Sequence, residues 1–180
     1  MDDIVKAALA KWPNVPHCTG WLALDARGDW YMRDDRIQAV GPFPKVKGSR
    51  IDHDKLKAFI ERNYDHDANG CWFFQNGPQR VYVELESAPW VWRVADAAAG
   101  FALSTHTGRA ARCASTWLDE HDHLFVDSPE GFGLVHSLDT TWAADAIETG
   151  AWPAPQSMLF DAMPARFGYC LSPHAGLGAV

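Results

Sequence analysis

The stretch DANGCWFFQNGPQRVYVELE, residues 67–86, holds the pattern that decides the fold. It begins with a turn sequence, Asp-Ala-Asn-Gly, and continues into the apolar run CWFF. An Asn-Gly pair then separates this run from RVYVELE, in which apolar and polar side chains alternate. Alternation with a period of two places alternate side chains on opposite faces of a β-strand. The stretch therefore predicts a β-hairpin whose second strand directs Val81, Val83 and Leu85 to one face.

The turn at the start of this stretch recurs along the chain. Residues 25–30 (DARGDW) and 67–72 (DANGCW) share an Asp, a Gly three positions later and an aromatic residue two positions further on. Residues 96–101 (DAAAGF) and 119–124 (DEHDHL) are looser copies. Asp at the first turn position accepts a backbone hydrogen bond, and Gly at the fourth adopts a positive φ. The recurrence predicts a series of antiparallel hairpins.

Three short helices are predicted beside these strands. The first covers residues 4–12, the second begins near Asp52 as its cap, and the third runs from Asp139 to Gly150. The third helix is expected to turn Trp142, Ala143, Ala146 and Ile147 inward. The predicted class is α+β: antiparallel hairpin or meander sheets flanked by about three short helices. The segment GPFPKVKGSR, residues 41–50, reads as a loop and as a candidate lid.

We expect the chain to form one compact domain, which could consist of two similar subdomains. Shifting the sequence by 52 positions lays residues 67–90 onto 119–142 and aligns four identical residues. Subdomains over about 14–95 and 96–150 would explain this pseudo-repeat, with 151–180 as a C-terminal segment. The hairpin turns alone could impose the same spacing.

The composition limits the classes of partner and the cellular compartment that we expect for this protein. The 180 residues contain 16 Lys and Arg against 23 Asp and Glu, a formal charge of −7, which disfavours nucleic acid and anionic membranes. The N-terminus lacks the apolar core of a secretory signal, and no apolar run is long enough to span a bilayer, so we expect a cytoplasmic protein. The cysteines Cys18, Cys71, Cys113 and Cys170 form no Cys-x-x-Cys pair and are expected to be free thiols, with two disulfides or one catalytic thiol as alternatives.

A cluster of acidic residues and histidines at 119–123 is the densest candidate metal site. Asp119, His121 and His123 carry the donor groups that divalent metals bind, and they would serve a metal-dependent hydrolase. The hairpin pattern instead places this segment at the tip of a turn, which is the favoured interpretation. The sequence contains no nucleophile elbow, phosphate-binding loop or dinucleotide fingerprint, and no cofactor is predicted.

Polar residues on strand faces are the better candidates for a ligand site. Arg80, Tyr82 and Glu84 share one face of a predicted strand, and Trp90 and Arg93 lie on the next strand. The planar guanidinium of Arg binds carboxylate and phosphate groups through two parallel hydrogen bonds. The pseudo-repeat aligns Glu84 with His136, so a groove between subdomains could present both residues. A solvated outer face with cross-strand charge pairs is the alternative.

Residues 20–34 (GWLALDARGDWYMRD) and 50–94, which include GCWFF and VYVELESAPWV, resemble proteobacterial families of uncharacterised proteins known as domains of unknown function. The resemblance extends over about residues 20–150. It implies a cytoplasmic α+β protein with two subdomains and a groove between them, and it supplies no catalytic residues. The AWPAP segment and the PARFGYCLSP ending depart from the more distant of these families.

Three functional hypotheses follow from these features. The first is a non-enzymatic module that binds a small anionic ligand or a protein partner in the groove. The second is the metal-dependent hydrolase, and the third is a structural or assembly partner, for which a homodimer is one form.

Overall fold

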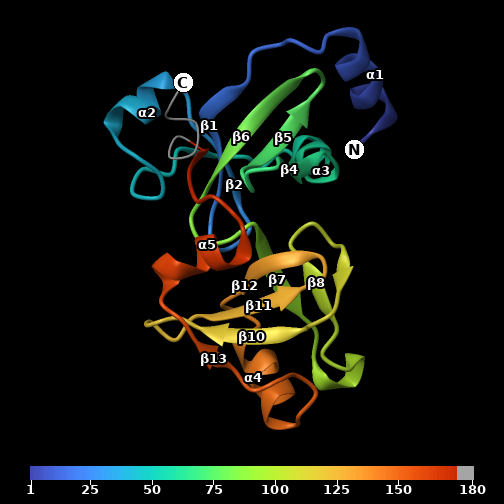
Figure 1. Cartoon of the computed structure of the whole chain (residues 1–180), viewed down its shortest axis with the longest axis vertical. Helices are drawn as coiled ribbons and strands as arrows, with labels where there is room; N and C mark the ends of the chain where they lie inside the picture. Colours follow the sequence, from blue (N-terminus) through green and yellow to red (C-terminus); the bar gives the residue numbers. More distant parts are fainter. Residues whose placement is uncertain (174–180) are drawn as a thin grey trace. The chain divides into compact units, whose positions relative to one another are not determined.

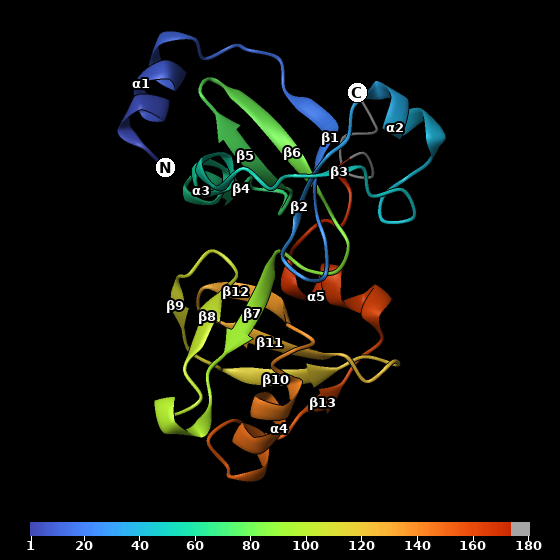
Figure 2. The same ribbon diagram turned by 180° about the vertical axis from the view of Figure 1, so that it is seen from behind.

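A computed structural model describes residues 1–173, which divide into two compact units (Figures 1 and 2). The first unit comprises residues 1–25, 29–86 and, at the end of the described chain, 168–173. The second comprises residues 26–28 and 87–167. Each unit is built around its own sheet, and the predicted α+β class with two sheets is confirmed.

Six strands of the described chain form the sheet of the first unit, in the order β3-β2-β1-β6-β5-β4. They are β1 (Cys18–Leu24), β2 (Trp30–Met32), β3 (Ser49–Arg50), β4 (Tyr64–His66), β5 (Trp72–Asn76) and β6 (Gln79–Leu85). The quoted hairpin is β5-β6, in which Phe73 faces Tyr82 and Phe74 faces Val81. Neighbours pair antiparallel except β1 and β6, which run parallel.

Seven strands of residues 87–167 form the second sheet, in the order β13-β10-β11-β12-β7-β8-β9. They are β7 (Trp90–Val94), β8 (Leu103–Thr105), β9 (Ala110–Ala111), β10 (Ser115–Leu118), β11 (Leu124–Ser128), β12 (Gly131–Val135) and β13 (Gln156–Ser157). The pairs β7-β12 and β10-β13 are parallel, and the others are antiparallel.

The two sheets share one topology. In each, three consecutive strands form one half and the next three form the other, and the first strand pairs in parallel with the sixth. The 52-residue shift brings the start of β5 onto that of β11 and the start of β6 onto that of β12. The same shift does not align β1, β2 and β3 with β7, β8 and β9, because α2 (Asp35–Val40) and α3 (Asp54–Arg62) lengthen the first unit between β2 and β4. The weak pseudo-repeat in the sequence thus corresponds to two similar sheet subdomains.

The recurring turn works through the predicted hydrogen bonds. Asp67 Oδ1 accepts from the N–H groups of Asn69 and Cys71 at 2.9 and 3.0 Å, and Gly70 has a φ of +75°. In the looser copy, Asp119 has the role of Asp67, and Asp122 takes the left-handed position with a φ of +61°. Asp tolerates this conformation better than most residues, which explains why the turn forms without Gly.

The three predicted helices are present, and two short ones accompany them in the described chain. α1 (Asp3–Lys11), α3 and α4 (Thr140–Glu148) match the predictions, whereas α2 and α5 (Met163–Phe167) were not predicted. Two 3₁₀ turns, Ala97–Ala99 and Phe160–Ala162, complete the elements. The cap of α3 is corrected by one residue: His53 Nδ1 accepts from Leu56 N–H at 3.2 Å, while the exposed Asp52 lies 3.4 Å from Arg50 Nε.

Each sheet carries its own apolar core. In the first unit α3 packs Phe59 edge-on against Phe74, at 5.3 Å between ring centroids, over fully buried Ile60. In the second unit the core includes Trp92 and Phe125, which are at most 1% exposed. The expectation that α4 turns Trp142 inward is wrong, because the buried stripe of this helix is made of Ala143 and Ala146 and leaves Trp142 39% exposed.

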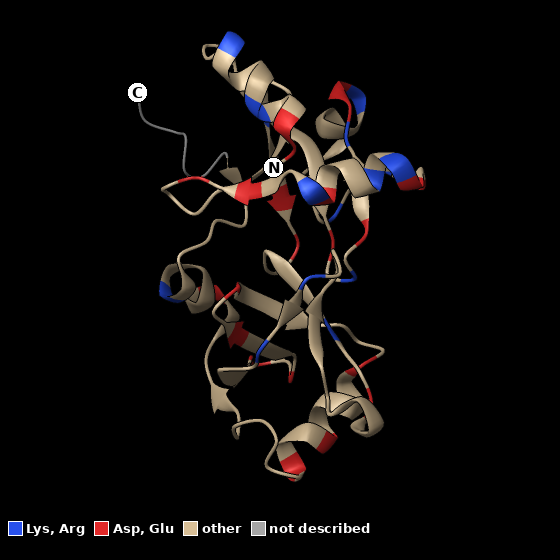
Figure 3. Cartoon of the chain, turned by 90° about the vertical axis from the view of Figure 1, so that its right-hand side faces the viewer, with Lys and Arg blue, Asp and Glu red and all other residues tan. Residues whose placement is uncertain are grey.

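Charged residues of both signs share the helices of the first unit (Figure 3). On α1, Lys6 pairs with Asp3, and on α3, Lys57 pairs with Asp54, each three positions earlier. No helix in residues 1–173 is long and apolar enough to cross a membrane.

Candidate functional site

The predicted residues Arg80, Tyr82 and Glu84 share one face of β6, and the side chains of Arg80 and Tyr82 contact neighbouring side chains of the same unit. The Tyr82 hydroxyl donates to Asp67 Oδ2 at 3.0 Å, and burial raises its pKa, so that it acts as a neutral donor. The Arg80 guanidinium lies 4.4 Å from the centroid of the Phe73 ring, in cation–π geometry. Both residues therefore contribute to the packing of the sheet. Glu84, which is 7% exposed, is the member of the set that faces a cavity.

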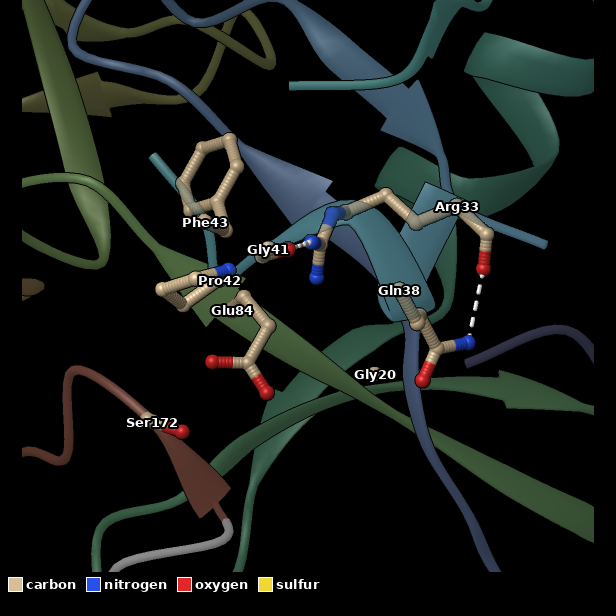
Figure 4. Close-up of a pocket in the computed structure, with 8 residues that line it drawn as sticks. All are labelled: Gly20, Arg33, Gln38, Gly41, Pro42, Phe43, Glu84 and Ser172. Atoms are coloured by element: carbon tan, nitrogen blue, oxygen red, sulfur yellow. Dashed lines mark hydrogen bonds between the residues drawn. The ribbon is translucent and has the colours of Figure 1, made fainter. Parts of the chain in front are cut away.

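This cavity has a volume of about 410 Å³ and lies within the first unit (Figure 4). Its walls come from β1, β6 and α2, from the residue that follows β2, from the loop that follows α2 and from the C-terminal segment. The lining residues are Gly20, Arg33, Gln38, Gly41, Pro42, Phe43, Glu84 and Ser172. A volume of several hundred cubic ångströms lies in the range of small-molecule sites.

β1 is irregular where it borders the cavity. Its register with β6 shifts between Cys18 and Leu22, and Gly20 within this bulge has a φ of +78°. Glycine at a bulge allows a close approach of backbone to a ligand, because no Cβ fills the space. The local break in β1 thus leaves open the space that Glu84 of β6 faces.

Arg33, at the end of β2, is only 4% exposed and is held rigidly. Its Nε donates to the Val46 carbonyl at 3.2 Å and its Nη2 to the Gly41 carbonyl at 2.7 Å. Within residues 1–173, neither of these bonds uses Nη1, and Figure 4 shows the guanidinium directed toward the space beside Glu84. A buried guanidinium held by two carbonyls keeps a fixed orientation and can offer its remaining N–H groups to a ligand.

The loop of residues 41–50, predicted as a candidate lid, forms one wall of the cavity. The Arg33 guanidinium carbon lies 5.9 Å from the centroid of the Phe43 ring. Lys47 Nζ donates to Asp25 and Glu86 at 2.9 Å each and ties the end of the loop to the residues that follow β1 and β6. Gln38 of α2 donates from Nε2 to the Arg33 carbonyl at 2.8 Å, which leaves its Oε1 toward the cavity side.

Arg93, predicted as an anion ligand, is bound by a carboxylate of its own unit. Its Nε and Nη2 donate to the two oxygens of Asp139 at 2.6 and 3.1 Å, and Val94 N–H donates to the same carboxylate at 3.1 Å. Burial favours the neutral acid, but these hydrogen bonds outweigh it and hold the pKa of Asp139 below its usual range. The pair lines a second cavity of about 360 Å³, in which the charge of the guanidinium is already neutralised.

Trp90 and His136 of the second unit also have structural partners. Trp90 Nε1 donates to the Glu130 carbonyl at 2.9 Å, and the Arg109 guanidinium lies 5.6 Å from its ring centroid. His136 Nδ1 accepts from Leu138 N–H at 3.0 Å. Arg80, Tyr82 and Glu84 thus belong to the first unit and Trp90, Arg93 and His136 to the second. A groove shared by the two sets stays a prediction.

The candidate metal ligands at 119–123 form a hairpin turn. Asp119 Oδ1 accepts from the N–H groups of His121 and His123 at 2.9 and 2.8 Å, and Oδ2 lies 2.8 Å from His123 Nδ1. Both histidines are exposed at the tip of the turn. No group of three or more His, Cys, Asp and Glu side chains within residues 1–173 is placed to hold a metal ion. The turn thus accounts for the contacts of Asp119.

Sequence reasoning missed Arg33, Gln38 and Phe43. The signal that could have found them was the loop rich in Gly and Pro at 41–50, which lies shortly after an Arg at the end of a strand. This signal predicts a loop near a positively charged residue, but it does not predict that Glu84 of β6 lines the same cavity.

The chain matches the family DUF2944, described as "Protein of unknown function (DUF2946)", over residues 1–174. The chain belongs to this family. The predicted relationship to uncharacterised proteins is confirmed. No curated protein matches the chain. A solved DUF1285 family protein from Silicibacter pomeroyi DSS-3 is 15% identical, with a TM-score of 0.49 over 81% of this chain and 84% of its own. Another, from Shewanella baltica OS155, is 17% identical, with a TM-score of 0.46 over 69% and 91%.

Proposed function

We propose that this DUF2944 protein is a binding module for a small molecule that carries both a carboxylate and an amino group, as amino acids do. The observation that supports this most directly is that a buried guanidinium, Arg33, and a buried carboxylate, Glu84, both line one cavity of ligand size. The proposal replaces the purely anionic ligand expected from Arg80 and Arg93. It keeps the expectations of a non-enzymatic, cytoplasmic protein.

The carboxylate of the ligand would bind at Arg33. The bonds to Val46 and Gly41 fix the guanidinium before a ligand arrives, so little conformational entropy is lost on binding. Hydrogen bonds between an ionised donor and an ionised acceptor are about twice as strong as neutral ones. Because Gly20 has no Cβ, the backbone at this bulge can approach the ligand closely.

The amino group of the ligand would bind at Glu84. A cavity that contained only a guanidinium would favour any small anion, whereas a carboxylate in the same cavity repels anions that lack a positive group. The Gln38 amide and the Ser172 hydroxyl add neutral polar contacts, and the Phe43 ring offers an apolar wall for a short side chain. The site therefore selects molecules with both charges.

The test is calorimetric titration of the purified protein with a panel of amino acids, each compared with its deaminated and its decarboxylated counterpart. Glu84→Gln keeps the shape of the side chain and removes its charge. We expect this variant to bind the amino acid about 10- to 100-fold more weakly, because it loses one charge-assisted hydrogen bond. Binding of the deaminated acid should be unchanged or stronger.

Glu148→Gln is the matched control, since it makes the same chemical change at an exposed position on α4. It should bind like the wild-type protein. Equal binding of the amino acid by the wild-type protein and by Glu84→Gln would contradict the proposal. It would also be contradicted if none of the compounds in the panel bound to the protein.

A further inference from the structure

Two cysteines that lie 99 positions apart meet in the first unit. Cys71, which follows the turn at 67–70, and Cys170, in the C-terminal segment, have their Sγ atoms 2.7 Å apart, and both are free thiols. Cys71, Phe73 and Tyr82 form a buried cluster against which Cys170 packs. Cys113, by contrast, has its Sγ 4.0 Å from the Ser115 carbonyl.

The backbone holds both thiols in place. Cys71 N–H donates to Asp67 Oδ1 at 3.0 Å, and Cys170 N–H donates to the Gly70 carbonyl at 3.1 Å. Gly70 lies so close to the backbone of Gly168 that any Cβ at position 70 would overlap the Gly168 carbonyl. Leu85 N–H donates to the Leu171 carbonyl at 2.8 Å and fixes the next residue of the segment. The two sulfur atoms are therefore neighbours because several independent contacts join the same two backbone segments.

We propose that Cys71 and Cys170 form a reversible disulfide that fastens residues 168–173 to the turn at 67–71. A disulfide needs two cysteines whose backbones are already close and held in a compatible orientation, since engineered bridges fail when they distort the fold. In a reducing compartment such a bond is transient and reports the redox state of the cell.

The chemistry requires a disulfide oxidant of low molecular weight, such as oxidised glutathione. Cys170 is half-buried and Cys71 is 3% exposed, so the Cys170 thiolate attacks one sulfur of the oxidant and releases one thiol. Burial and then the neighbouring Cys170 raise the pKa of Cys71 to about 12, which keeps this thiol protonated in the first step. Cys71 then gives up its proton and attacks the Cys170 sulfur, which releases the second thiol. The two cysteines are oxidised, and the oxidant is reduced to two thiols.

The bond would act on the cavity described above. Ser172, on the cavity wall, lies two residues beyond Cys170. In the dithiol form this segment is held to the rest of the first unit by the backbone hydrogen bonds at Leu171 and Cys170, by the bond from the Cys170 thiol to the Asn69 carbonyl at 3.3 Å, and by apolar packing. The disulfide adds a covalent bond, so oxidation restricts the movement of one wall of the cavity.

The test is equilibration of the full-length protein with mixtures of reduced and oxidised glutathione, followed by acid quenching, alkylation and peptide mapping by mass spectrometry. We expect a cross-link between the peptides that contain Cys71 and Cys170 to be the main oxidised product. Cys18 and Cys113 should stay reduced and should therefore be recovered in alkylated form. Thermal unfolding should occur roughly 10 °C higher in the oxidised protein, because the bond closes a loop of about 100 residues.

Cys113→Ser is the matched control and should retain both the cross-link and the shift in melting temperature. Cys170→Ser should lose both. If that variant does not fold, the peptide map of the wild-type protein still decides the question. Persistent glutathione adducts at Cys170 without a cross-link, or a cross-link that involves Cys18 or Cys113, would overturn the proposal.

Discussion

At Gly70, the conformation of a turn and the packing of a distant segment depend on the same residue. Its φ of +75° lies in the region that residues with a Cβ rarely adopt. A Cβ at this position would overlap the Gly168 carbonyl oxygen, which belongs to the backbone and cannot rotate away. The sequence pattern explains the first requirement, and only the tertiary structure reveals the second.

Gly70→Ala should therefore lower the free energy of unfolding by about 2–4 kcal/mol, of which about 1 kcal/mol comes from the positive φ and the rest from the clash. The measurement is urea unfolding followed by tryptophan fluorescence. Gly108→Ala is the control, because Gly108 has a φ of +81° but no described atom lies within 4 Å of the place that its Cβ would occupy. It should cost about 1 kcal/mol. Equal losses for the two variants would mean that the contact with Gly168 does not constrain the fold.

At the scale of the element, α3 shows how a neighbouring contact decides a helix cap. Asp is a better capping residue than His, and the sequence therefore favours Asp52. In the structure Ile51 is buried and its N–H donates to the Trp30 carbonyl at 2.8 Å, so the chain is still paired with β2 at that point. The helix begins later, and His53 Nδ1 accepts the hydrogen bond from Leu56 N–H.

His53→Ala should destabilise the protein by about 0.5–1.5 kcal/mol through loss of the cap. Asp52→Ala should change the stability by less than about 0.5 kcal/mol, because its ion pair with Arg50 is exposed. Paired denaturant titrations of the two variants give the comparison. A larger loss for Asp52→Ala than for His53→Ala would restore Asp52 as the cap.

The turns and strand hairpins show how much of the element level is local. The spacing of Asp67 and Gly70 predicts both the turn and the strands that flank it, because these hydrogen bonds join residues at most four positions apart. The pairing of β1 with β6 could not be predicted in this way. It joins strands separated by most of the first unit, and nothing within either strand specifies a parallel neighbour.

At the scale of the whole molecule, acid should destabilise the protein mainly through the second unit. His106 is half-buried, and its Nδ1 accepts from Val91 N–H at 3.2 Å, which requires an unprotonated nitrogen. Burial, together with the charge of Arg109, lowers the pKa of His106 to about 3. The unfolded chain, with a pKa of 6.5, binds this proton first. The contribution of His106 to stability is therefore complete above pH 6.5 and is lost as the pH falls toward 3.

We expect the free energy of unfolding to fall by up to about 1.4 kcal/mol per pH unit from His106 across this interval. The pKa of Asp139 is also lowered, so the free energy of unfolding falls further as the pH drops below the usual pKa range of a carboxyl group. His106→Asn keeps an acceptor for Val91 N–H and removes the titration, so its stability should depend less steeply on pH between about 6 and 4. His121→Asn, at an exposed turn, should keep the slope of the wild type. Chemical unfolding at several pH values measures all three, and identical slopes would show that folding does not shift the pKa of His106.

The sequence by itself determined the acidic character of the chain, its recurring hairpin turns, the longer strands and three of its helices. Each of these depends on residues within a few positions of one another, where hydrogen-bond geometry and side-chain periodicity act directly. The tertiary structure alone decided which polar residues meet. Arg33 and Glu84 line one cavity, and Cys71 lies beside Cys170, because parallel strand pairing and the return of the C-terminal segment bring distant residues together. Arg93, by contrast, meets Asp139, and this partner removes it from the candidates for a ligand.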